Sequence, residues 1–257
     1  MNIMIYKQIL LNMRMTIYVI GFIILFMFPA RLLGQYVCYD KDGYTNIRSG
    51  PGMQFEIVDS VSKYEVFYSS DWLCTDGRSL DTSLTWIPFA RSIYDAPDKY
   101  VFRKNIRLLD DMPQLWADFS EDDMLLSCSN DTISINLVLK DFDVNNHVIK
   151  DTTQSDGSKV IQSINGEWPK GIHFHLDIGE EIKGKEISAL YIGNGNKRTN
   201  LPIDAIKEYF NPQMSVFLGY ENELYIYIGV GDASGAYGIC LSVVDGIVKY
   251  VLKWSAC

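Results

Sequence analysis

Downstream of its first 34 residues, the chain alternates apolar and polar positions in many short stretches. Within 132–139 every second residue is isoleucine or leucine, and 172–178 repeats the pattern. Because successive side chains of a strand point to opposite faces, these stretches predict half-buried β-strands. Further strands are predicted at 223–230 and 238–244, and Asp245-Gly246 is a hairpin turn that leads into a strand at 247–252.

A helical period occurs once. Ile203, Ile206 and Phe210 would share one face of a helix that begins near Pro202 and ends at Asn211-Pro212. With one short helix among many strands, residues 99–257 are predicted to form a larger antiparallel β domain, a sandwich or an open barrel. The polar, proline-containing stretch Asp95–Lys99 predicts the domain boundary near residue 98.

The first 34 residues have the layout of a secretory signal peptide. Lys7 and Arg14 precede an apolar run at 17–28, and Gly34 is a small residue before the expected cleavage site near Gln35. The run is short for a membrane span. We therefore expect a periplasmic or secreted protein that has no membrane contact after cleavage, and a retained signal anchor is the alternative.

Residues 38–61 combine two turn signals with a strand pattern. Asp42-Gly43 and Ser49-Gly50-Pro51-Gly52 predict tight turns, in which glycine tolerates positive φ and proline fixes φ. Between these turns Tyr44, Asn46 and Arg48 alternate with three other residues, as a half-buried strand requires.

The pattern Asn46-x-Arg48-x-Gly50-Pro51 resembles the signature of bacterial Src-homology-3-type (SH3b-like) domains, and Thr85-Trp86-Ile87 lies where that family has a Gly-Trp-Val/Ile strand. The resemblance covers 35–94 and implies a small β-barrel over 35–98. It also implies that the barrel binds cell-wall peptides or protein partners. The segment from Leu201 looks like an uncharacterised module that follows such barrels in secreted proteins of Bacteroidota-type bacteria, and the resemblance attaches no activity to it.

The formal net charge of −9 becomes −12 when residues 1–34, with three basic residues and no acid, are removed. This acidity argues against nucleic acid as a partner. The five cysteines match no zinc or redox motif. In an exported chain the simplest pairing is Cys38 with Cys74 and Cys128 with Cys240, leaving Cys257 over, and free buried thiols are the alternative.

Aromatic residues are frequent in the predicted barrel, and aromatic-lined grooves bind extended peptides in this architecture. Trp86, between apolar neighbours, and Phe67 are expected in the core. The ligand-binding candidates are Tyr44, Asn46, Arg48 and Trp72.

Two enzymatic interpretations compete with a binding role. His173, His175 and Asp177 would lie on one strand face, where they could hold a divalent metal for a hydrolase, although any amphipathic strand shows this spacing. Cys128 with one of these histidines would suggest a papain-like peptidase, but Cys128 precedes a strand and the helix N-terminus that activates such cysteines is missing. No catalytic residue and no cofactor is therefore assigned.

The sequence thus predicts a mainly all-β, exported binding protein without catalytic activity. Its barrel would recognise a cell-wall peptide or an envelope protein. The alternatives are a metal-dependent hydrolase that uses His173, His175 and Asp177, and a structural envelope component or inhibitor.

Overall fold

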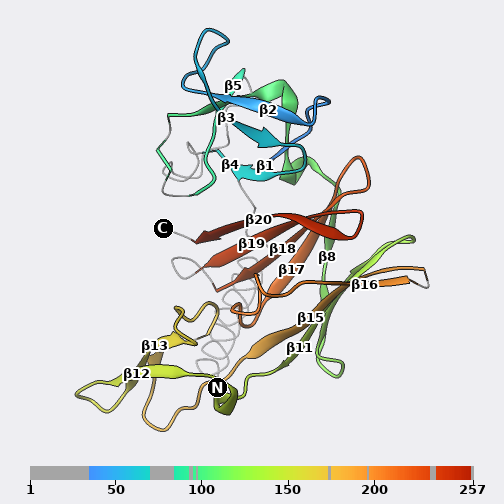
Figure 1. Cartoon of the computed structure of the whole chain (residues 1–257). Coiled ribbons are helices and arrows are strands. Elements are labelled where there is room, and N and C mark those ends of the chain that lie inside the picture. Colours follow the sequence, from blue (N-terminus) through green and yellow to red (C-terminus); the bar gives the residue numbers. More distant parts are fainter. Residues whose placement is uncertain are drawn as a thin grey trace, which may run out of the picture. The chain divides into compact units, whose positions relative to one another are not determined.

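The computed structural model describes residues 35–69, 84–92, 95–96, 98–172, 175–195, 197–231 and 236–255 (Figure 1). The described residues belong to one compact unit. In the described residues all strand pairs are antiparallel, and the helical segments are three short 3-10 turns, η1 (Arg103–Asn105), η2 (Leu109–Asp111) and η3 (Val144–Asn146). The predicted all-β class is confirmed.

Two small sheets form the N-terminal part. One has the order β4-β1-β7 and the other β3-β2-β6-β5. They share a core to which each strand contributes inward-facing residues, among them Cys38, Ile47, Phe67, Val101 and Ile106. The strands are β1 (Gln35–Cys38), β2 (Tyr44–Arg48), β3 (Ile57–Ser62), β4 (Val66–Tyr68), β5 (Trp86–Pro88), β6 (Tyr100–Phe102) and β7 (Ile106–Leu108).

Strand pairing in this part continues past the predicted boundary at residue 98. β6 pairs with β2 and β5, and β7 pairs with β1. Val101 and Ile106 are fully buried in the shared core. The predicted boundary therefore falls between β5 and β6, two strands that pair in the same sheet.

Two five-stranded sheets pack face to face in the C-terminal part. Their apolar inner faces form one core cluster. The β11 sheet has the order β16-β15-β11-β10-β9, with β9 (Asp118–Ser120), β10 (Leu125–Ser129), β11 (Ser134–Asp141), β15 (Lys185–Asn194) and β16 (Lys197–Leu201). The β18 sheet has the order β20-β19-β18-β17-β8, with β8 (Gln114–Trp116), β17 (Gln213–Leu218), β18 (Leu224–Val230), β19 (Tyr237–Val244) and β20 (Ile247–Ser255). The predicted antiparallel domain is a sandwich.

The turn between β19 and β20 matches the prediction. Asp245 and Gly246 both have positive φ, 53° and 75°. This is the backbone of a type I′ hairpin, which Asp-Gly favours because glycine has no Cβ to clash.

An additional three-stranded sheet, the insert sheet, is built from the chain between β11 and β15. It has the order β12-β13-β14, with β12 (Ile149–Thr153), β13 (Lys159–Ile164) and β14 (His175–Leu176). Its apolar side has its own small core, in which Ile161, Ile164 and Leu176 pack with Phe210. Phe210 lies just after the turn at 204–208, so this turn is attached to the insert sheet.

Both faces of strand β18 are buried. Ile226 and Ile228 point into the sandwich core, while Tyr225 and Tyr227, on the opposite face, are 0% and 9% exposed. Residues of the N-terminal part contact that second face: the Tyr68 hydroxyl donates to the Lys253 carbonyl at 3.0 Å. Buried strands of this kind have nearly continuous apolar sequences, which explains the run at 224–230.

Polar contacts between the N-terminal part and the β18 sheet gather at the β17–β18 turn. The Tyr39 hydroxyl donates to the carboxylate of Glu223, which is itself 0% exposed and also accepts the backbone N–H of Tyr220 at 3.0 Å. Lys63 forms an ion pair with Glu221 at 2.7 Å. The hydrogen bonds from Tyr39 and Tyr220 satisfy the buried carboxylate of Glu223, which would otherwise be costly to desolvate.

The predicted helix at 202–211 is wrong. Residues 204–208 form a turn, with the Lys207 N–H donating to the Ile203 carbonyl at 2.9 Å. Tyr209 and Phe210 then form bridges with Lys170 and Glu186. A helix between Pro202 and Pro212 would be short, and its few hydrogen bonds would barely offset the cost of nucleation. Extended backbone at Phe210 instead bridges to Glu186 of the β11 sheet, while the Phe210 side chain packs in the core of the insert sheet.

The predicted disulfide between Cys128 and Cys240 is also wrong, and the alternative of free buried thiols holds for Cys38, Cys128 and Cys240. Cys128 lies in the sandwich core, whereas Cys240 pairs with Tyr227 across the opposite face of the β18 sheet. The sheet therefore separates the two sulfur atoms. Cys74 and Cys257 lie outside the described residues.

Alkaline pH is expected to destabilise the fold. Burial raises the pKa of Cys38 and Cys128 from 9.0 to about 11. Between pH 9 and 11 the unfolded chain has therefore lost thiol protons that the folded chain keeps, so the free energy of unfolding falls with pH. In this range each thiol lowers the free energy of unfolding by about 1.4 kcal/mol per pH unit. The stabilisation that comes from keeping the thiols protonated is fully present below pH 9.

Urea unfolding at intervals from pH 8 to 11 measures this slope. In Cys128→Ala the free energy of unfolding should fall less steeply with pH, because the contribution of one thiol is missing. A free energy of unfolding that stays constant from pH 9 to 11 would contradict the assignment of buried, protonated thiols.

Candidate functional site

Three of the predicted ligand-binding residues share the outward face of β2. Tyr44 is 51% exposed, and Asn46 and Arg48 are half-buried, whereas Thr45 and Ile47 between them point into the core. This is the alternation predicted from the sequence, and it arises because β2 has a core on one side only.

Aromatic rings from two further strands extend this face. Tyr100 and Phe102 of β6 are half-buried on either side of the buried Val101, and Tyr100 pairs with Arg48. Trp86 of β5 pairs with Phe102, with ring centroids 5.2 Å apart. We call the set Tyr44, Asn46, Trp86, Tyr100 and Phe102 the aromatic face.

The core prediction for Trp86 needs correction. Its neighbour Ile87 is 1% exposed and belongs to the core, whereas Trp86 is half-buried on the other side of the strand. Phe67 is fully buried, as predicted. Its neighbours in the sequence, Thr85 and Ile87, do not indicate which way the ring of Trp86 points.

Arg48 is engaged within the protein. Its guanidinium donates to the carbonyls of Met53 at 3.1 Å and Phe55 at 2.6 Å. A Cβ on Gly50 would lie 2.3 Å from the Phe55 ring, so glycine is needed for this approach. Arg48 therefore fixes the 49–56 loop at one end of the aromatic face. Trp72, the fourth candidate, lies outside the described residues.

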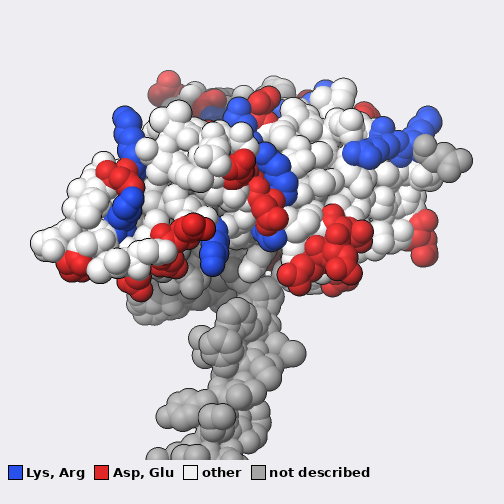
Figure 2. Space-filling model, turned by 90° about the horizontal axis from the view of Figure 1, so that it is seen from below, with Lys and Arg blue, Asp and Glu red and all other residues white. Residues whose placement is uncertain are grey.

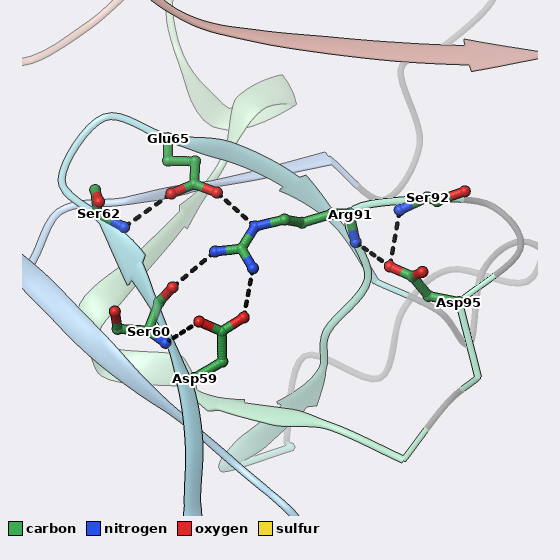
Figure 3. Close-up of polar contacts among 7 residues, drawn as sticks. All are labelled: Asp59, Ser60, Ser62, Glu65, Arg91, Ser92 and Asp95. Carbon is green, nitrogen blue, oxygen red and sulfur yellow. Dashed lines mark hydrogen bonds and ion pairs between the residues drawn. The ribbon is translucent and has the colours of Figure 1, made fainter.

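Arg91 binds three groups beside β3 (Figure 3). Its guanidinium donates to Glu65 at 2.8 Å, to Asp59 at 2.5 Å and to the Ser60 carbonyl at 2.7 Å. Burial alone would raise the pKa of Asp59, but the hydrogen bonds from Ser60 and Arg91 outweigh it and lower that pKa. Asp95 accepts the backbone N–H groups of Arg91 and Ser92, and so holds the segment in place.

Among the described strands β3 pairs with β2 alone, so it is an edge of the four-stranded sheet, and the Arg91 cluster lies along that edge. The N–H of Ser60 donates to Asp59 at 2.7 Å, and the N–H of Ser62 donates to Glu65 at 3.0 Å. With the Ser60 carbonyl bound by Arg91, these backbone groups are not open to another strand. Addition of a further strand at this edge is therefore disfavoured.

The structure places two of the three metal candidates on the insert sheet. His175 lies in the short strand β14 and Asp177 just beyond it, and both side chains are exposed. His173 lies outside the described residues. Among the residues that the structure describes, no group of three or more His, Cys, Asp or Glu side chains is placed to hold a metal ion.

A buried pair that the sequence analysis missed joins His147 to Glu186, 3.1 Å apart. The side-chain oxygen of Asn165 accepts the Val148 N–H at 2.9 Å, so its amide nitrogen faces Nδ1 of His147 at 2.9 Å. Nδ1 is then an acceptor, and Nε2 donates to Glu186. Burial opposes ionisation of Glu186, yet hydrogen bonds from His147 and Lys140 lower its pKa.

Both ring nitrogens of His147 are thus occupied, which favours a structural role over that of a base or metal ligand. The ring also stacks on Phe142, with centroids 4.6 Å apart. No local motif surrounds His147 in the sequence, because its partners are 18 and 39 positions away.

Charged groups are interspersed on the face shown in Figure 2, where acidic and basic side chains lie side by side. None of the helical segments in the described part of the chain has the length and apolarity needed to cross a bilayer. Comparisons with protein-family models, with curated proteins and with solved structures give no match for this chain.

Proposed function

We propose that the protein is an exported binding protein and that its aromatic face recognises a cell-wall peptide or a protein partner in the envelope. One observation carries the proposal: Tyr44, Trp86, Tyr100 and Phe102, from three strands, keep their rings on the outer side of a sheet whose inner side has its own core. Aromatic side chains are enriched at binding hot spots.

The composition of the face favours an extended peptide. Flat rings provide contact area at a low entropic cost, and Asn46 can both donate and accept hydrogen bonds to a peptide backbone. The covered edge of β3 argues against strand addition, so side-chain contacts would supply most of the affinity. Export rests on the signal-peptide layout of residues 1–34.

Tyr44→Ala is expected to weaken binding about thirtyfold, which corresponds to about 2 kcal/mol, because hot-spot truncations typically cost at least this much. Thermal unfolding should change little, since Tyr44 is 51% exposed. Titration calorimetry with a synthetic cell-wall stem peptide, and capture from an envelope extract, would measure the effect.

Phe119→Ala is a matched control, because Phe119 is 48% exposed on β9 of the β11 sheet, outside the aromatic face. Equal binding by the two variants would rule out the aromatic face as the ligand site. Unfolding of Tyr44→Ala at a much lower temperature would instead assign Tyr44 to the structural framework.

A further inference from the structure

A hollow of about 440 Å³ lies where the insert sheet meets the β11 sheet and the segment 203–208. This volume is within the range of small-molecule sites. Apolar side chains form part of its lining, namely Ile164, Ile187, Ile203 and Phe210. The hollow shares no residue with the aromatic face, so it is independent of the function proposed above.

Trp168 lines the hollow and is 44% exposed. It lies in the connection between β13 and β14, one residue after Glu167, whose N–H donates to the Ile164 carbonyl at 3.0 Å. This bond anchors the connection to the end of β13. The exposed part of this ring adds apolar surface at the border of the hollow.

Charged residues around the hollow have partners of opposite sign. Lys140 pairs with the buried Glu186 at 3.2 Å, and Glu208 pairs with Lys170 at 3.1 Å. Glu167 also lies 3.8 Å from Lys170, and Lys207 lies 3.3 Å from Asp204. An ionic ligand would have to compete with these pairs, whereas a neutral ligand can hydrogen-bond to them while they stay intact.

We propose that this hollow binds a neutral saccharide of one or two pyranose rings. A pyranose has an apolar C–H face, which suits the ring of Trp168, and a border of hydroxyl groups. Those hydroxyls can both donate and accept, so they match paired lysine and glutamate groups together with Ser188 and Asn165, which also line the hollow. The apolar and the polar parts of the lining then both contact the ligand, without the need for a net charge on it.

The test is titration calorimetry of the purified protein with three neutral disaccharides, cellobiose, lactose and N,N′-diacetylchitobiose, and with the zwitterion triglycine. At least one disaccharide should bind, and Trp168→Ala should weaken that binding at least tenfold. Trp116→Ala is the matched control, because Trp116 is 54% exposed on β8, outside the hollow, and its loss should leave affinity unchanged. Raising the salt concentration should have little effect on a neutral ligand.

Trp168→Phe keeps a ring at this position and should retain most of the affinity, so it separates loss of the ring surface from misfolding. Thermal unfolding of each variant checks that the fold is intact. The proposal is overturned if no disaccharide binds at about 10 mM, if Trp168→Ala binds as well as the original protein, or if triglycine binds more tightly than every disaccharide.

Discussion

Replacing Phe67 with alanine is expected to lower the free energy of unfolding by about 3–5 kcal/mol, the usual cost of truncating a buried aromatic residue. Phe67 is 0% exposed and packs between Tyr36 and Phe89, with ring centroids 5.9 and 4.8 Å away. These rings belong to the shared core of the two N-terminal sheets, so the cavity would open at its centre.

Urea unfolding monitored by circular dichroism gives the free energy directly. Trp86→Ala should cost less than Phe67→Ala, because Trp86 is half-buried, and Phe119→Ala should stay within about 0.5 kcal/mol of the original protein. A loss below about 1 kcal/mol for Phe67→Ala would mean that this core contributes little to the measured transition.

A fragment that ends at the boundary predicted from the sequence, 35–98, is expected to show no cooperative unfolding at all. It lacks β6 and β7, and with them the pairing partners of β1, β2 and β5 and the buried Val101 and Ile106. A domain of about 60 residues is already marginal, so the loss of two strands leaves too little buried surface.

The fragment 35–112 contains all seven strands and is the natural comparison. It should unfold cooperatively but at lower urea concentration than the same region in the full chain, because Tyr68 and Tyr39 lose their contacts with the β18 sheet. Cooperative unfolding of 35–98 would show that β6 and β7 are dispensable, contrary to their place in the core.

The alternation of apolar and polar residues predicted those strands that have one buried and one exposed face. Residues 132–139 fall largely within β11, and the half-buried strand predicted from the alternation around Asn46 is β2. Residues 172–178 have the same alternation, yet the strand described there is the two-residue β14, and Ile178 is 77% exposed. Alternation alone does not reveal whether a partner strand is present.

The remaining features depend on contacts that are distant in sequence. Tyr100 and Phe102 join the aromatic face only because β6 pairs with β2, more than fifty positions earlier. The turn that replaced the predicted helix is set by bridges from Tyr209 to Lys170 and from Phe210 to Glu186. Tertiary context of this kind overrides local propensity, and a single sequence contains no direct record of it.

The burial of strand β18 on both of its faces affects how its register is specified. In a strand buried on both sides, polarity cannot indicate which residues face which way, but in β18 the two sides differ chemically. One side carries Ile226 and Ile228 into an aliphatic core, and the other carries Tyr225, whose hydroxyl donates to that of Tyr39 at 3.3 Å. A slip of one residue would bury phenol hydroxyls among aliphatic side chains and leave them without partners, at a cost of about 1–3 kcal/mol each. Tyrosine hydroxyls thus specify a single alignment where apolar burial alone would permit two.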